Sequence, residues 1–322
     1  MATSSGEQVI AIEEHYWDPA LVAHYSGTDA TGGAGALRPK LEDLYDQRIA
    51  EMDSAGIDIQ VLSHGAPSTQ RLDASSAAEI TRTANDRLQE IVAEKPDRFA
   101  AFGNLPTPDP AACADELERC VDKLGFKGAM IHGLTHGVFF DDSKFWPVFE
   151  RAQALDVPLY MHPASPDSIV VERYYQPYVE DFPALLNAGW GFTVETATQA
   201  IRLVLSGVLE KYPDVKILIG HLGEGLPFLL WRIDHALSRP GNKPLNFREV
   251  FSRNFFITTS GNFSDPALVC SLQELGADRI LFSVDWPFVP NNLGTEWIER
   301  LQLNGEDKTK ILNGNAKRLL KL

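Results

Sequence analysis

The stretch "TQAIRLVLSGVLEKYPDVKILIGHLGEGLP", residues 198–227, decides the fold. Its first half, Thr198–Pro213, places apolar residues at i, i+3 and i+4, which predicts an amphipathic helix. Its second half contains Lys216–Gly220, a short apolar run typical of a buried parallel strand. A helix that leads into a buried strand is one part of a repeating β-α pattern, which pairs its strands in parallel.

The same alternation recurs along the chain. Eight short apolar runs are expected to be strands, and helical patterns such as Pro147–Asp156 separate most of them. The runs are Val9–Ile12, Ile59–Ser63, Phe99–Gly103, Gly128–Ile131, Pro158–Met161, Lys216–Gly220, Phe256–Thr259 and Ile280–Val284. Eight such units predict a (β/α)8 TIM barrel, which usually needs roughly 250 residues plus insertions. A doubly wound sheet is the competing fold, but no Gly-x-Gly-x-x-Gly follows the first strand.

Two segments do not fit the repeat. Residues 163–191, after the fifth strand, are rich in proline, tyrosine and acids, and we expect a loop insertion over the barrel mouth that also serves as an oligomer contact. Residues 24–40 are rich in glycine and alanine and are expected to be flexible. No second domain boundary is visible, so we predict a single domain over residues 1–322.

Composition limits the classes of function. The chain is 44% hydrophobic and 23% charged, as is usual for a globular protein, and its net charge of −15 argues against a nucleic-acid or anionic-membrane partner. Cys113, Cys120 and Cys270 lie far apart and predict neither a disulfide framework nor a zinc ribbon. Without a signal peptide or an apolar run of about 20 residues, we expect a soluble, cytoplasmic protein with no membrane partner.

Polar residues end most of the predicted strands. The carboxyl ends of the strands build the active site of a barrel of this kind, and five of the eight histidines follow an apolar run there. These histidines are His15, His64, His132, His162 and His221. Glu13 precedes the first of them by two residues, and Asp285 ends the eighth run, where a buried strand has no packing reason to place an acid.

The spacing of these residues favours a metal site. Glu13 and His15 share a face of the strand, because residues i and i+2 point the same way, and Glu14 points to the other side. Pro163 disfavours helical geometry at the preceding residue and keeps the fifth strand extended to its end. Two carboxylates and two imidazoles suit Zn²⁺ or Mn²⁺. We predict one divalent metal ion, with these ligands: Glu13, His15, His162 and Asp285.

Two details refine the metal prediction. Lys127 begins the fourth strand region, whereas a lysine that bridges two metals would stand at the end of that strand, so a single metal is favoured. Glu14 serves as the comparison residue: we expect Glu14→Gln to retain the metal and Glu13→Gln to lose it.

A second group follows the sixth strand. His221 and Glu224 are close enough in sequence for the carboxylate to orient the imidazole and raise its basicity, which favours proton transfer. The alternative is that this segment is only a strand-to-helix turn, with glycine for backbone freedom and proline early in the helix. Arg232 suits the grip of a substrate carboxylate, and an ion pair with Asp234 explains it equally well.

Four motifs in this order, "EEHY", "LYMHPA", "GHLGEGLPFLLWRIDH" and "LFSVDWPF", resemble the amidohydrolase-2 type metal enzymes. The segments "GEGLPFLLWRID" and "ITTSGNF" are similar to the branch that decarboxylates ortho-hydroxybenzoates. The resemblance implies a (β/α)8 barrel, one divalent metal, no organic cofactor, and a homodimer or homotetramer. It also implies that His221 and Glu224 form the catalytic pair and that Arg232 lies near the substrate.

The expected function is therefore reversible, non-oxidative decarboxylation of a small aromatic carboxylic acid of the 2,6- or 2,3-dihydroxybenzoate type, with Asp285 protonating the ring. His64, His132 and Phe288 are expected to help line the substrate pocket. Residues 130–142 depart from the family pattern, since His132 stands where "NGFS" is expected, and this leaves the ring substituents open. The alternatives are a metal-dependent hydrolase of an ester, lactone or amide, and a non-catalytic metal-binding scaffold.

Overall fold

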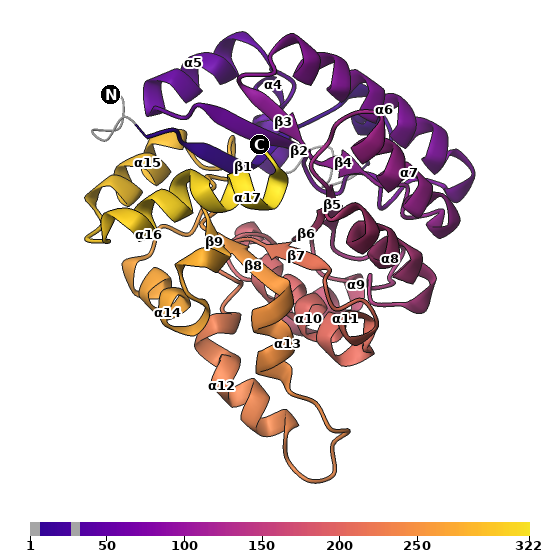
Figure 1. Ribbon diagram of the computed structural model, residues 1–322. Coiled ribbons are helices and arrows are strands. Elements are labelled where there is room, and N and C mark those ends of the chain that lie inside the picture. The colour runs from indigo at the N-terminus through magenta and orange to yellow at the C-terminus, as the bar shows by residue number, and fades with distance from the viewer. Residues whose placement is uncertain (1–6, 27–32) are drawn as a thin grey trace.

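A computed structural model describes residues 7–26 and 33–322. Each paired strand runs parallel to its neighbours, in two sheets ordered β1-β2-β3 and β4-β5-β6-β7-β8-β9. The strands are β1 (Ile10–Tyr16), β2 (Ile59–His64), β3 (Phe99–Ala101), β4 (Gly103–Asn104), β5 (Ala129–His132), β6 (Pro158–His162), β7 (Lys216–Ile219), β8 (Phe255–Thr258) and β9 (Ile280–Leu281). Figure 1 shows them at the centre of the molecule with helices around them.

The two sheets join into one closed barrel. The third predicted strand is interrupted at Phe102, whose N–H still donates to the carbonyl of Leu62 at 2.9 Å, so β3 and β4 act as one barrel strand. At the other seam, the N–H of Asp285 donates to the carbonyl of Glu13 at 3.1 Å, and the N–H of His15 donates to that of Trp286 at 2.7 Å. The predicted (β/α)8 barrel is confirmed.

Helices follow each barrel strand, and most of them cover its outer face. The principal ones are α5 (Asp46–Ala55), α6 (Ala74–Glu94), α7 (Pro110–Asp122), α8 (Trp146–Leu155), α10 (Gly191–Ser206), α12 (Leu226–Leu237), α13 (Phe247–Asn254), α14 (Asp265–Leu275), α15 (Asn291–Arg300) and α17 (Asn315–Leu320). Shorter ones are α1 (Pro19–Val22), α3 (Gly33–Ala36), α4 (Arg38–Leu41), α9 (Ser168–Val170), α11 (Val208–Lys211) and α16 (Gly305–Thr309). Proline in the first turn helps to start α7 and α14, since its fixed φ suits that position.

The core has an outer and an inner part. The outer cluster lies between the strands and the surrounding helices, as the alternation of side chains along a strand requires. The inner cluster fills the barrel with residues such as Ile12, Phe102 and Leu218, and Leu319 of α17 packs against it. Side chains therefore fill the barrel interior, which is a packed core.

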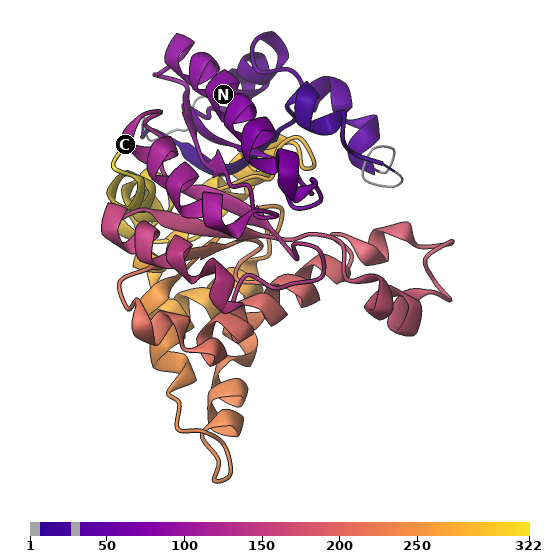
Figure 2. The same cartoon turned by 90° about the vertical axis from the view of Figure 1, so that its right-hand side faces the viewer.

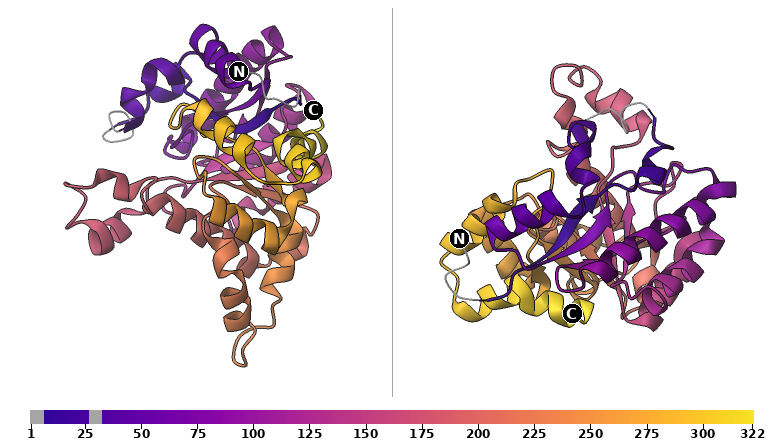
Figure 3. Two further views of the ribbon diagram at one scale, coloured as in Figure 1. Left: turned by 90° about the vertical axis from the view of Figure 1, so that its left-hand side faces the viewer. Right: turned by 90° about the horizontal axis from the view of Figure 1, so that it is seen from above.

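Two arms project from the barrel. The predicted insertion, residues 163–191, extends away from the barrel up to the start of α10 and includes α9 and the short helices η2 (Val171–Tyr175) and η3 (Pro183–Leu186). Figure 2 shows this arm on the right, where it projects away from the barrel. The second arm is formed by α12, α13 and the loop between them, at the bottom of Figure 1 and in the left view of Figure 3. The sequence analysis did not predict this second arm.

The stretch that was expected to be flexible is partly helical, since α3 and α4 fall within it, and residues 27–32 lie outside the described residues. None of the helices in residues 7–26 and 33–322 combines the length and apolar character that crossing a bilayer requires.

Candidate metal and catalytic site

Four polar side chains from distant parts of the chain meet at one end of the barrel. Glu13, His15, His162 and Asp285 each offer one donor atom, and these atoms lie within 4.8 Å of one another. Nε2 of His162 is 3.3 Å from Oε1 of Glu13, and Nε2 of His15 is 3.3 Å from Oδ1 of Asp285. Bonds of about 2.0–2.2 Å to a shared ion place its ligand atoms roughly 3–4 Å apart, so this spacing fits a divalent metal.

The burial of these atoms supports the same reading. Glu13 and His15 are fully buried, and neither Oε1 of Glu13 nor Nε2 of His15 has a hydrogen-bond partner. Burial raises the pKa of Glu13 above its usual value. A buried carboxylate oxygen and a buried imidazole nitrogen left unpaired are costly, and a shared cation would satisfy both atoms.

Three hydroxyl groups hold the Glu13 carboxylate in place. Tyr160, Thr258 and Ser260 all donate to Oε2 of Glu13, the last two from the end of β8. None of these three residues was predicted to belong to the site. The alternation of side chains along a strand could have indicated Tyr160 and Thr258, because Tyr160 shares a strand face with His162, and Thr258 shares one with Ser260.

Hydrogen bonds at the remote ring nitrogens orient the two histidines. Nδ1 of His162 lies 2.7 Å from the carbonyl of Pro163, and Nδ1 of His15 lies 3.2 Å from Oγ of Ser63. These contacts turn the Nε2 atoms toward the carboxylates, as is usual for metal-binding histidines. Burial, together with the neighbouring His15, holds the pKa of His162 well below its usual value, so the ring is neutral and able to bind a metal.

Asp285 links the metal group to the predicted catalytic pair. Its Oδ2 lies 3.9 Å from Nε2 of His221, whose Nδ1 lies 2.7 Å from Oε1 of Glu224. Burial alone would lower the pKa of His221, but the charge of Glu224 and hydrogen bonds that His221 donates to Asp285 and Glu224 raise it well above its usual value. Asp285 and His221 have φ values of 77° and 53°, a conformation that residues other than glycine rarely adopt outside functional sites and tight turns.

Residues 11–322 match the amidohydrolase family. The chain belongs to this family. It is 41% identical over 325 residues to the γ-resorcylate decarboxylase of a Polaromonas species, with 97% of this chain and 98% of the relative covered. It is 39% identical, over 97% of this chain and 98% of the relative, to the γ-resorcylate decarboxylase of a Rhizobium species. The resemblance noted in the sequence is therefore confirmed.

Solved structures give the same relationship. This amidohydrolase superimposes on a 2,6-dihydroxybenzoate decarboxylase complexed with 2,6-dihydroxybenzoate with a TM-score of 0.89 at 39% identity, covering 98% of this chain and 100% of the other. A Polaromonas dihydroxybenzoic acid decarboxylase, solved with manganese and the inhibitor 2-nitroresorcinol, gives a TM-score of 0.90 at 41% identity, covering 98% and 97%.

Two of the predicted substrate residues adjoin the metal group of this amidohydrolase. The ring of Phe288 lies 5.7 Å from that of His15 and is 39% exposed, so it borders both the site and the solvent. Nδ1 of His132 lies 3.0 Å from Nδ1 of His162, and Nε2 of His132 has no hydrogen-bond partner. His132 also lines a cavity of about 240 Å³, together with residues 164–168 at the base of the insertion.

Other predicted residues lie elsewhere or are engaged in structural contacts. Nε2 of His64 accepts the N–H of Asp18 at 2.9 Å, and its Nδ1 lies 2.8 Å from the carbonyl of Gly65, so both ring nitrogens are occupied. Arg232 is exposed on α12, with no ion pair to Asp234 among the described residues, and the structure does not bring it to the metal group. The substrate roles of His64 and Arg232 stay predictions.

Lys127 lies at the opposite end of its strand from the metal group, as the prediction of a single metal requires. Nζ of Lys127 donates to the carbonyl of Lys321 at 3.4 Å, at the end of the barrel that α17 covers.

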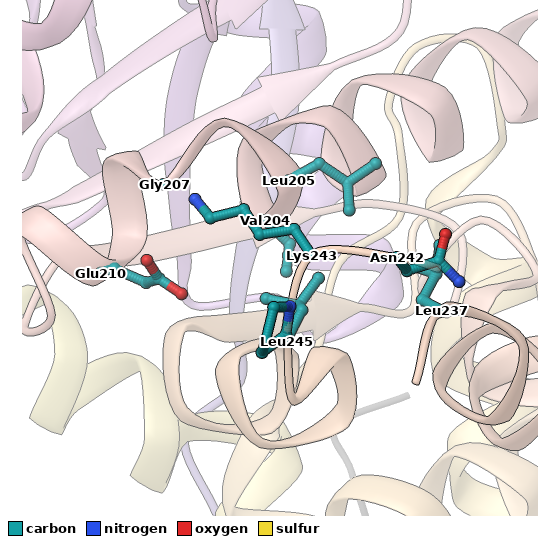
Figure 4. A pocket seen from close by; sticks show the side chains of 9 residues that line it. Val204, Leu205, Gly207, Glu210, Leu237, Asn242, Lys243 and Leu245 are labelled. Carbon is teal, nitrogen blue, oxygen red and sulfur yellow. The ribbon is translucent and has the colours of Figure 1, made fainter. Parts of the chain in front are cut away.

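A second cavity, of about 220 Å³, lies between α10, α11 and the loop after α12, where Lys243 and Glu210 line it (Figure 4). None of the metal group lines this second cavity, which is separate from the site.

Proposed function

We propose that this amidohydrolase is a metal-dependent carboxy-lyase that releases CO2 from an ortho-hydroxybenzoate such as 2,6-dihydroxybenzoate. The observation that carries the proposal is the position of Asp285, which lies 3.3 Å from His15 in the metal group and 3.9 Å from His221 in the catalytic pair. A single carboxylate thus connects the place that binds substrate oxygens to a residue able to move protons. The relatives that are about 40% identical are named for this reaction.

The donor set is suited to Zn²⁺ or Mn²⁺, held by Glu13, His15, His162 and Asp285. The bound ion supplies a Lewis acid that draws electron density from the carboxylate and the ortho hydroxyl of the substrate. Manganese is present in the structure of the Polaromonas relative, which supports this choice.

The chain's own residues manage the proton. Direct loss of CO2 would leave an aryl anion, which is too basic to form at neutral pH, so the ring is protonated first. Asp285 takes up a proton from His221 and delivers it to the carbon that bears the carboxylate, and this carbon becomes sp³. The C–CO2 bond then breaks, its electron pair returns to the ring, and CO2 leaves with aromaticity restored. His221, oriented by Glu224, hydrogen-bonds the substrate and returns a proton to Asp285.

The proposed reaction is also reversible, because the ring is neither oxidised nor reduced. High bicarbonate should therefore carboxylate resorcinol, the product of 2,6-dihydroxybenzoate.

The test is an assay of CO2 release by the purified metal-loaded enzyme on 2,6- and 2,3-dihydroxybenzoate, with ester, lactone and amide substrates alongside. The proposal expects CO2 from a dihydroxybenzoate, and Asp285→Asn should reduce turnover by about 100-fold or more. Hydrolysis of a lactone without CO2 release would establish the hydrolase alternative. Normal decarboxylation by Asp285→Asn would remove that residue from the mechanism.

We further propose a homodimer or homotetramer in a reducing compartment such as the cytoplasm. Both arms expose large apolar side chains, which in a soluble protein mark interaction surfaces. These are Ile169, Tyr174, Tyr178, Phe182 and Trp190 on one arm, and Phe228, Leu229 and Trp231 on the other. All three cysteines are free thiols. Analytical ultracentrifugation should give a mass of two or four chains for the wild type and a smaller one for Phe228→Asp.

A further inference from the structure

Glu14 lies between two metal ligands in the sequence but faces away from the metal group. Its side chain is fully buried and contacts the segment that carries Asp285. From the sequence, Glu14 was expected to lie on the opposite face of the strand and not to bind the metal. The structure gives it a different set of contacts.

The Glu14 carboxylate brackets Asp285 from both sides. Its Oε1 accepts the N–H of Val284 at 2.8 Å and the hydroxyl of Ser283 at 3.2 Å. Its Oε2 accepts the N–H of Trp286 at 3.1 Å. The backbone N–H groups of the residues immediately before and after Asp285 therefore both donate to the Glu14 side chain.

These bonds act where the regular sheet has ended. The ladder between β8 and β9 stops at Leu281, so residues 282–286 have no continuous strand partner. Asp285 has a φ of 77°, which a residue with a side chain holds only where its surroundings fix it. Backbone bonds to β1, from Asp285 to Glu13 and from His15 to Trp286, provide part of this restraint. Glu14 adds further restraint through its side chain.

Two charged side chains also contact Trp286 or its neighbours. The guanidinium of Arg48, from α5, lies 4.0 Å from the centre of the Trp286 ring and donates to the carbonyl of His15. Glu51 accepts the indole N–H of Trp286 at 2.7 Å. Because these contacts fix Trp286, which is itself buried, a change at Glu14 should displace the Val284–Asp285 peptide more than it displaces the rest of the loop.

We propose that Glu14 is a positioning residue, which sets the place and direction of the Asp285 carboxylate through the amides of residues 284 and 286. The inference rests on the proposed function for its kinetic consequence only. The hydrogen bonds of Glu14 run to residues 283, 284 and 286, so it holds Asp285 through the residues on either side of it.

The test compares Glu14→Gln with three variants. Glu14→Gln keeps the shape but places an amide N–H₂ against one of the N–H donors. Ser283→Ala removes one of the three bonds with little risk to folding. Glu13→Gln removes a metal ligand outright. Glu116→Gln is the matched control, since Glu116 is a buried carboxylate on α7 that accepts from Asn85 at 2.7 Å and lies outside the site.

Two measurements do not depend on turnover. In Co²⁺-loaded protein, the visible spectrum reports the ligands of the ion, and Glu14→Gln should shift it while Co²⁺ still binds, whereas Glu13→Gln should lose the ion. In metal-free protein, hydrogen exchange at residues 282–288 should speed up in Glu14→Gln by about tenfold or more, with a smaller increase in Ser283→Ala. Glu116→Gln should change neither.

Turnover gives the third measurement. Glu14→Gln should lower kcat on 2,6-dihydroxybenzoate by roughly 10- to 100-fold and leave KM within about threefold, because the substrate contacts remain. The proposal is overturned if Glu14→Gln and Ser283→Ala both keep the wild-type spectrum and exchange. If the wild type fails to decarboxylate, the proposed function fails, and the spectrum and exchange still decide the role of Glu14.

Discussion

The hydroxyl of Tyr160 donates to Oε2 of Glu13, so the residue two positions before one candidate metal ligand, His162 on β6, supports another candidate ligand on β1. Thr258 and Ser260 complete the arrangement from β8. The carboxylate oxygen that faces away from the metal group is thus saturated with donors, and its other oxygen is left for the ion.

This arrangement predicts that Tyr160→Phe weakens metal binding. Removing a hydrogen bond to a ligand typically lowers metal affinity by about 10- to 100-fold, because the ligand is less well oriented. Titration of the metal-free protein with Mn²⁺ measures the effect. Tyr212→Phe is the control, since that hydroxyl contacts Glu150 at 3.3 Å outside the barrel. Equal affinities of the two variants would show that Tyr160 does not support the site.

The His221–Glu224 pair predicts a different response. Glu224→Gln should lower kcat by at least about tenfold, since the carboxylate that orients His221 at 2.7 Å and raises its basicity is lost. The metal content should stay at the wild-type level, because Glu224 is not part of the metal group. Elemental analysis beside steady-state kinetics separates the two effects. Loss of the metal in Glu224→Gln would assign Glu224 to the support of the metal instead.

Much of this site was predictable because parallel strands end at one edge of a barrel. Glu13, His15, His162 and Asp285 are far apart in the sequence, and the prediction needed only their positions at strand ends and the period of two. His221 and Glu224 meet as expected because they are neighbours in one turn. The confirmed fold rests on the same repeat.

Other features depend on how distant segments align, which a single sequence does not encode locally. Glu14 binds residues 283–286 only because β1 lies beside the end of the last strand, and the break at Phe102 depends on two different partner strands. His64 ends a strand like the other histidines, but the loop that carries Asp18 occupies its Nε2. The arm formed by α12, α13 and the loop between them was not predicted, because a helical pattern does not show whether a helix stays on the barrel surface.

Glu195, on α10, predicts a pH dependence of stability. Burial, with the nearby charge of Asp167, raises its pKa from 4.5 to about 7, and its Oε1 has no hydrogen-bond partner. Between pH 4.5 and pH 7 the folded state therefore binds more protons than the unfolded state, and this residue's contribution to stability falls as the pH rises through that range. Glu195→Gln should be more stable than the wild type at pH 8 by about 1–2 kcal/mol, a value reduced because water reaches part of the site.

Urea unfolding of both proteins at pH 5 and pH 8 measures this difference. The advantage of Glu195→Gln should be smaller at pH 5, where the wild-type carboxyl is protonated. Glu210→Gln, at an exposed position on α11, is the control and should follow the wild type at both pH values. An advantage of Glu195→Gln that is the same at both pH values would trace the gain to packing and not to ionisation.

Removal of the metal should destabilise the barrel. The fully buried Glu13 and His15 would then keep unpaired polar atoms, and the binding free energy of the ion would be lost. An ion present at a thousand times its Kd contributes about 4 kcal/mol to the free energy of unfolding, so EDTA should lower Tm by several degrees and added Mn²⁺ should restore it. Glu13→Gln, which lacks one ligand, should show little further change with EDTA. An equal shift in Glu13→Gln would place the stabilising ion somewhere other than this group.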